Sequence, residues 1–261
     1  MKLYRIWGIF LRYYFNLWRT YDRLSDVFFW PLVDLTLWGL TSRYIAGTGI
    51  ASNLVVLSLL GGILLWIFPW RSQYEISVNL LEDLWNRNLV NMFGTPIRFS
   101  EWIVTLLLTG IFKSIISFIF ASAIAFLLYS TNIYTVGVNL IPWAVMLMMF
   151  GWVFGLLIAA AIMRFGTKIQ TLAWTSIYLV VPFVGVYYPI SSLPMWAQNI
   201  SHFVPASYVF EAMRSTIQGH PVPLTALFWP LILCGVYLTL AFVILYNSYR
   251  HILKRGLISV E

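Results

Sequence analysis

Two charged residues, Asp34 and Lys113, lie inside apolar stretches long enough to sit in a membrane. A lone charge at the centre of a bilayer costs on the order of 2.5–3.5 kcal/mol on insertion scales, so such residues pair with an opposite charge or line a wet path. We therefore predict that both side chains face protein or water instead of lipid. Structural pairing is the favoured interpretation, and whether the two pair with each other is left open. Binding of a translocated substrate is the alternative.

Residue types that carry catalysis or bind metals are scattered along the sequence. His202, His220 and His251 lie far apart, and the single cysteine, Cys234, provides no disulfide framework. The sequence contains no glycine-rich phosphate loop ending in Gly-Lys-Ser or Gly-Lys-Thr, so this chain is not expected to hydrolyse ATP by that chemistry. We expect no enzymatic activity, no catalytic residue and no metal or cofactor bound by this chain.

The composition points to a membrane protein. Hydrophobic residues make up 61% of the 261 and charged residues only 10%, whereas soluble domains carry roughly 25% charged residues. No Asp, Glu, Lys or Arg occurs in residues 114–163, 169–210 or 215–249. Since about 20 apolar residues cross the hydrocarbon core, we predict an all-α polytopic membrane protein.

Six transmembrane spans are expected. They are residues 27–46, 54–70, 102–129, 140–163, 169–188 and 224–248. Thirteen of the sixteen Lys and Arg residues then fall on the side of the two termini, while Arg43 and Arg214 lie on the other side and Lys113 within a span. Because short cytoplasmic segments carry the excess of basic residues, both termini are predicted to be cytoplasmic. The net charge of +7 reflects this topology, and a nucleic-acid partner is not expected.

The first 25 residues are predicted to form an amphipathic helix at the cytosolic interface. At helical spacing, one narrow stripe carries Lys2, Arg5, Arg12, Arg19 and Arg23, and apolar residues occupy the opposite face. Such a helix lies in the interface with its basic face toward anionic headgroups. A soluble helix that binds a partner is the alternative.

A polar, helix-capable segment, residues 79–96, separates the second and third predicted spans. Asn79 and Glu82 have the spacing of a capping box, and Gly94 followed by Pro96 predicts the end of the helix. We interpret this segment as a docking helix whose apolar side enters a groove on a cytosolic subunit. Anchoring of Trp85 at the headgroups is the alternative. The proposed contact residues are Glu82, Asp83, Leu84, Trp85, Asn86, Arg87, Asn88 and Leu89.

The segment 189–223 on the opposite side is unusually apolar for a loop. Pro189, Pro194 and Pro205 divide it into two short amphipathic pieces, about 195–203 and 206–218. Because non-helical backbone at membrane depth must be covered by protein or line a wet cavity, we predict two short helices in a re-entrant arrangement against the outer mouth. An ordinary extracytoplasmic loop is the alternative.

Aromatic residues make up 18% of the chain. Trp30, Trp66 and Trp70 lie near predicted span ends and are interpreted as interface anchors. Trp38, Trp174 and Tyr178 lie deeper, and with Asp34 and Lys113 they are the candidate residues of a translocation path.

These features together resemble the ABC-2 type permeases of ATP-binding-cassette exporters. The resemblance covers essentially the whole chain, 1–261, and rests on LLEDLWNRNLVNMFGTPI and YYPISSLPMWAQNISHFVPASYVFEAMR. It implies a single transmembrane domain that pairs with a second copy or a homologous permease, and residues 82–89 as the coupling helix for a separate ATPase subunit that holds ATP and Mg. The family-like positions at the outer side form a candidate gate, namely Pro194, Pro205, Glu211 and Arg214.

The expected function is therefore that of a permease subunit in the cell (plasma or inner) membrane. It would export an amphiphilic or hydrophobic substrate, such as a lipid-linked glycan, a lipid or a hydrophobic small molecule. Three alternatives stay open: an ion-coupled carrier or channel, a membrane assembly subunit without transport, and an intramembrane enzyme. An enzyme would need more acidic residues in the spans than Asp34, and a carrier would need several or an internal repeat.

Overall fold

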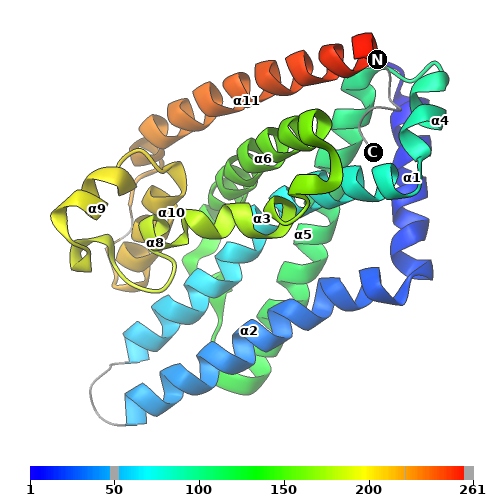
Figure 1. The fold of residues 1–261 in the computed structure, drawn as a ribbon. Coiled ribbons are helices and arrows are strands. Elements are labelled where there is room, and N and C mark those ends of the chain that lie inside the picture. Colours follow the sequence, from blue (N-terminus) through cyan, green and yellow to red (C-terminus); the bar gives the residue numbers. More distant parts are fainter. Residues whose placement is uncertain (48–52, 221, 256–261) are drawn as a thin grey trace.

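The computed structural model describes residues 1–47, 53–220 and 222–255, and every regular element in these ranges is a helix (Figure 1). The first half contains α1 (Leu3–Arg19), α2 (Tyr21–Gly47), α3 (Asn53–Trp85), α4 (Asn88–Gly94), α5 (Phe99–Tyr129), η1 (Ile133–Asn139) and α6 (Leu140–Phe165). The second half contains η2 (Gly166–Ile169), α7 (Leu172–Thr175), η3 (Ser176–Leu179), α8 (Val181–Val184), η4 (Ile190–Ser192), α9 (Met195–Ser201), α10 (Pro205–Ile217), η5 (Leu224–Leu227) and α11 (Phe228–Arg255). The all-α prediction is confirmed.

Four of these helical stretches are long and apolar enough to cross a membrane. They are Leu54–Trp85, Phe99–Tyr129, Ile133–Ile169 and Leu224–Lys254. They contain the second, third, fourth and sixth predicted spans, so the chain is a membrane protein by its helices as well as by its composition. The first predicted span lies within α2, which is not one of the four.

The fifth predicted span, residues 169–188, is not one continuous helix. The chain forms the short pieces η2, α7, η3 and α8, and only a shorter apolar stretch, Leu172–Val184, remains. Gly185 follows with a positive φ of 76°. Pro182 and Gly185 explain why the helix stops here, because proline removes a donor and glycine enters the left-handed region at little cost.

α3 continues beyond the predicted second span and ends only at Trp85. The predicted capping box at Asn79 and Glu82 is therefore wrong, since both residues lie inside the helix. Asn79 donates to the carbonyl of Glu75 one turn earlier, and Glu82 pairs with Arg23 of α2. The predicted end of the cytosolic helix at Gly94 is confirmed by the end of α4.

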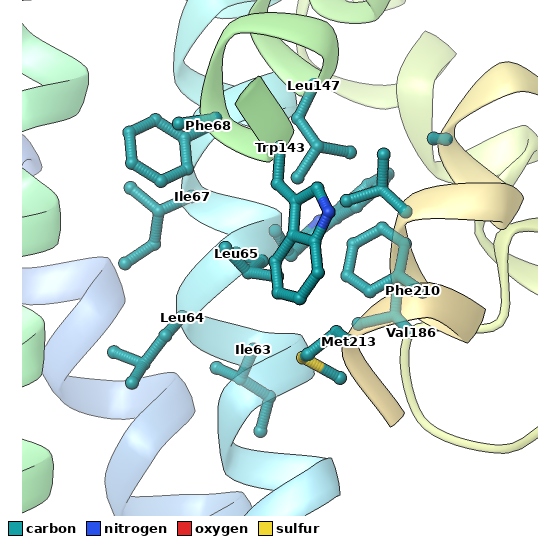
Figure 2. Close-up of a cluster of buried hydrophobic side chains, with 14 of the residues drawn as sticks. Ile63, Leu64, Leu65, Ile67, Phe68, Trp143, Leu147, Val186, Phe210 and Met213 are labelled. Carbon is teal, nitrogen blue, oxygen red and sulfur yellow. The ribbon is translucent and has the colours of Figure 1, made fainter. Parts of the chain in front are cut away.

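The hydrophobic core is built around α3, which packs against α5 and α6. Figure 2 shows Trp143 of α6 among side chains of α3, with Phe210 and Met213 of α10 beside it. Two glycines let α3 and α6 approach closely: a Cβ built on Gly151 would lie 2.3 Å from the carbonyl oxygen of Pro69, and one on Gly155 would lie 2.8 Å from Ile76. This is the small-residue contact that membrane helices use.

The start of α1, the start of α5 and the last turns of α11 share one end of the bundle, which we name the terminal end. The backbone N–H of Lys2 donates to the Glu101 carboxylate over 2.8 Å, and the Phe99 and Tyr249 rings stack at 4.1 Å. α9 and α10 lie toward the other end, where the Tyr237 hydroxyl of α11 donates to the Phe203 carbonyl (Figure 1).

α1 ends at Arg19, shorter than the predicted 25 residues, and its basic stripe is divided between exposed and buried residues. Ile6, Ile9, Tyr13 and Leu17 are buried against the bundle. Arg5 and Arg12 pair with Glu101 and Asp83, and the buried Arg23 at the start of α2 pairs with Glu82. Lys2, Arg12 and Arg19 are exposed, so part of the stripe faces outward.

Candidate functional site

A network of ion pairs joins α2, α3 and α5 inside the bundle, and we name it the polar network. Its members are Arg23, Asp26, Arg71, Glu75, Glu82 and Lys113. Glu75 lies at its centre, with Lys113 Nζ at 2.6 Å and Arg71 at 3.7 Å. The three positive and three negative charges balance, as burial in a medium of low dielectric requires.

Lys113 is 3% exposed, so the prediction that it faces protein is confirmed. Whether it pairs with Asp34 was left open by the sequence, and its partner is instead Glu75, which the sequence argument did not consider. The sequence does contain a pattern that indicates Glu75 as part of an ionic cluster. Arg71, Glu75 and Asn79 recur every four residues, so they lie on one face of a helix, where ionic side chains meet.

The turn between α3 and α4 is the most exposed part of the predicted coupling segment. Trp85, Asn86 and Arg87 are exposed, and we name these three residues the coupling tip. Arg87 has a φ of 52°, a left-handed conformation that reverses the chain. The Trp85 ring stacks on Trp174 at 6.3 Å, so Trp174 lies beside this tip and not within a central path.

The residues flanking the coupling tip fasten it to the neighbouring helices. The buried Asp83 carboxylate accepts hydrogen bonds from Arg12 and from the Tyr13 hydroxyl of α1, the latter over 2.8 Å. Burial, with the nearby negative charge of Asp83, raises the pKa of Tyr13 well above its usual value, so the phenol remains a donor at neutral pH. Leu89 is buried, whereas Leu84 and Asn88 are half-buried.

A cavity of about 490 Å³ lies between α1 and α4, beside the coupling tip. Its lining includes Tyr4, Arg12, Asn91 and Met92. The cavity is open and mostly apolar, and it is continuous with the exposed side of α1. An apolar side chain of a partner would fit such a groove.

Three of the predicted path residues gather around α2. Asp34 is half-buried and lines a small pocket together with Tyr178. One turn further along α2, Trp38 stacks on Tyr187 at 4.6 Å. The structure therefore brings Asp34, Trp38 and Tyr178 to one side of the bundle and separates them from Lys113 and Trp174.

The candidate gate residues lie in α9, α10 and the turn before them. Pro194 immediately precedes α9, and Pro205 is the first residue of α10, so the two predicted short helices are confirmed. Glu211 and Arg214 form an ion pair at 3.0 Å. Arg214 also donates to the backbone carbonyls of Gly185 and Val186, and burial lowers its pKa. α10 is thereby tied to the end of the broken fifth segment.

Arg214→Leu is expected to lower the free energy of unfolding by about 2–3 kcal/mol, because it leaves buried carbonyls without their charged donor. The midpoint of thermal unfolding in detergent should fall, and protease cleavage near Gly185 should become faster. Glu211→Gln should have a smaller effect, since the Glu211 side chain is 41% exposed. The exposed Arg250 provides the control Arg250→Leu, and equal midpoints for Arg250→Leu and Arg214→Leu would contradict this role.

The fold and these contacts define a class: an all-helical membrane protein with buried ion pairs near its terminal end and an exposed aromatic tip beside them. Within the described ranges, no three His, Cys, Asp or Glu side chains are grouped as metal ligands would be. No family model matches the sequence, and no curated protein matches it either.

Proposed function

We propose that this chain is the permease subunit of an ATP-binding-cassette exporter of the ABC-2 type. It works as a dimer with a second copy or a homologous permease, and a separate ATPase subunit supplies the energy. The chain lies in the cell (plasma or inner) membrane with both termini in the cytoplasm. Its cargo is amphiphilic or hydrophobic.

The observation that carries this proposal is the exposed coupling tip, which adjoins buried residues bonded to a neighbouring helix. Trp85 is 48% exposed at the end of α3, whereas the adjoining Asp83 is 1% exposed and bonded to α1. A half-exposed aromatic ring at such a turn is typical of an anchor for a partner groove. The family resemblance assigns this segment to ATPase coupling.

The ion pairs explain how a push on the tip would reach the membrane helices. Asp83 connects the tip to α1, Glu82 connects it to α2, and Glu75, two turns up α3, connects it to α5. Since packed interiors transmit displacement instead of absorbing it, closure of two ATPase subunits would move these four helices together. A partner that contacts the tip differently in its two states would bias the bundle between inward- and outward-facing forms.

Six spans are part of the proposal. α2 has 27 residues and is about 40 Å long at 1.5 Å per residue, enough to cross a bilayer. The broken segment 169–188 would serve as the fifth span, because irregular backbone is tolerated at membrane depth where protein covers it. Its α7 packs against α3, and its α8 packs against α10.

The test is co-purification with candidate ATPase subunits of the ATP-binding-cassette class. Trp85→Ala with Arg87→Gly should weaken binding of the ATPase by about 30-fold or more, the usual cost of removing an interface hot spot. Glycine is chosen at position 87 because it adopts positive φ without strain. Trp18→Ala is the matched control, since Trp18 is 50% exposed on α1 at the same end.

The variant Asp83→Asn distinguishes an effect on folding from an effect on ATPase binding. Asp83 is 1% exposed and bonded to Arg12 and Tyr13 of α1, so its substitution should lower the unfolding midpoint by more than the tip variant does. Unchanged ATPase binding in the tip variant would remove the docking assignment. Transport by the purified chain alone, driven by an ion gradient, would favour the carrier alternative.

A further inference from the structure

The pocket that contains Asp34 has the features of a binding site. The fold does not require this pocket. It lies between α2, α3 and the η3 piece, and its walls include Trp30, Trp66, Trp70 and Tyr178. The cavity measures about 20 Å³, and a single water needs about 10–15 Å³ measured in this way. One small polar group therefore fits between the aromatic rings without rearrangement.

One polar group in this pocket lacks a protein partner. Across the described chain, no cation and no hydrogen-bond donor contacts the Asp34 carboxylate, in contrast to the paired Glu75, Asp83 and Glu101. Asp34 is half-buried, and burying a charged group without a partner is unfavourable, so its carboxylate is a reason to expect a ligand.

The chemistry of the walls selects the class of ligand. A carboxylate among aromatic faces favours an organic ammonium, since both the charge and the ring quadrupoles attract it. A hard metal ion would need several oxygen ligands, and the pocket offers few. The size of the cavity favours a primary ammonium over a trimethylammonium group.

The position of the pocket indicates how the ligand enters. Trp30 and Tyr178 at its rim are 48% and 49% exposed, so the pocket opens on the outer surface of the bundle. The exposed surface of α2 around it is apolar, with Phe29, Val33 and Leu37. A hydrocarbon tail would lie along this surface while the head enters the pocket.

We propose that the Asp34 pocket binds the head of a cationic amphiphile, a long-chain primary ammonium. The Asp34 carboxylate accepts from the ammonium, and Trp30 and Tyr178 enclose the head. That this amphiphile is the transported cargo rests on the proposed function. The binding itself does not.

Calorimetric titration of the full chain in dodecyl maltoside micelles tests this proposal. The probes are 2-amino-1-dodecanol and 1,2-dodecanediol, which differ only in the ammonium. The wild-type chain should bind the amino alcohol at least ten-fold more tightly than the diol, and equal affinities would overturn the proposal without any variant.

Variants then assign the contacts. Asp34→Asn should remove the preference for the amino alcohol, while Asp22→Asn, the same change at an exposed position of α2, should keep it. Retained preference in a monodisperse Asp34→Asn sample would overturn the assignment.

Two further measurements distinguish failure of the pocket assignment from failure of the proposed function. Displacement of the amino alcohol by an ethanolamine-headed phospholipid would assign the pocket to a zwitterionic headgroup and overturn the claim of a cationic amphiphile. Stimulation of ATP hydrolysis is measured separately, in a complex with the ATPase. Ammonium binding by a chain that binds no ATPase would contradict the proposed function but not the pocket assignment. A working complex with the ATPase that does not bind the ammonium would contradict only the pocket assignment.

Discussion

Glu75→Gln is expected to lower the free energy of unfolding by about 3–5 kcal/mol, because it leaves Lys113 buried without its partner. Glu75 is fully buried and Lys113 is 4% exposed at its side chain, and the two meet at 2.6 Å. In a protein of this size the loss corresponds to a fall of roughly 10 °C in the unfolding midpoint. The measurement is thermal unfolding in detergent, followed by the monodisperse fraction.

Lys113→Met should cost less than Glu75→Gln. After this change, Glu75 still has Arg71 at 3.7 Å and the amide of Asn79 at 3.0 Å, whereas Lys113 has no partner besides Glu75 in the described structure. The double variant should recover part of the loss, since replacing both members of a buried pair is often nearly neutral. The exposed Lys168 supplies the control Lys168→Met. Strictly additive losses would show that the two residues do not interact.

Gly151→Ala is expected to have the second largest effect, a loss of about 2–3 kcal/mol from overpacking. The added methyl would lie 2.3 Å from the carbonyl oxygen of Pro69 and 2.9 Å from its Cα. Neither atom can move away as a flexible side chain would, because both belong to the backbone of α3. α6 would have to move away from α3, at the contact where the core around Trp143 is built (Figure 2).

The same substitution at Gly235 of α11 is the matched control. No atom lies within 4 Å of a Cβ placed there, so Gly235→Ala should be neutral or stabilising by up to about 1 kcal/mol through helix propensity. Opposite signs at the two positions, measured by thermal unfolding, would establish that close packing and not loss of glycine is responsible. A stable Gly151→Ala protein would contradict the tight contact between α3 and α6.

The two predictions concern different contacts of the same helix, α3, which ends at the coupling tip. The Glu75–Lys113 pair connects α3 to α5 near the coupling tip, and Gly151 connects α3 to α6 further from it. Variants at both sites would make α3 looser against its neighbours. If the proposed function holds, a looser α3 should still bind the ATPase through Trp85 but transport cargo less efficiently.

Composition and periodicity predicted what depends on local sequence. The apolar stretches predicted the four helices that are long and apolar enough to cross a membrane, and Gly94, Pro194 and Pro205 marked helix ends that the structure contains. Predictions from local patterns were wrong where a side chain pairs with a residue distant in sequence instead of with a near neighbour. Asn79 and Glu82 have the spacing of a helix start, yet α3 continues through them because Glu82 finds Arg23.

The sequence by itself determined the class of this protein: apolar runs of sufficient length can be buried only in lipid or against each other, whatever their order in space. Only the tertiary structure decided which charges meet. It assigned Lys113 to Glu75, paired Arg12 with Asp83 and placed Asp34 in a pocket with Trp66 without a charged partner. The physical reason is that ionic contacts act over a few ångströms between residues distant in sequence, and helix packing alone sets those distances.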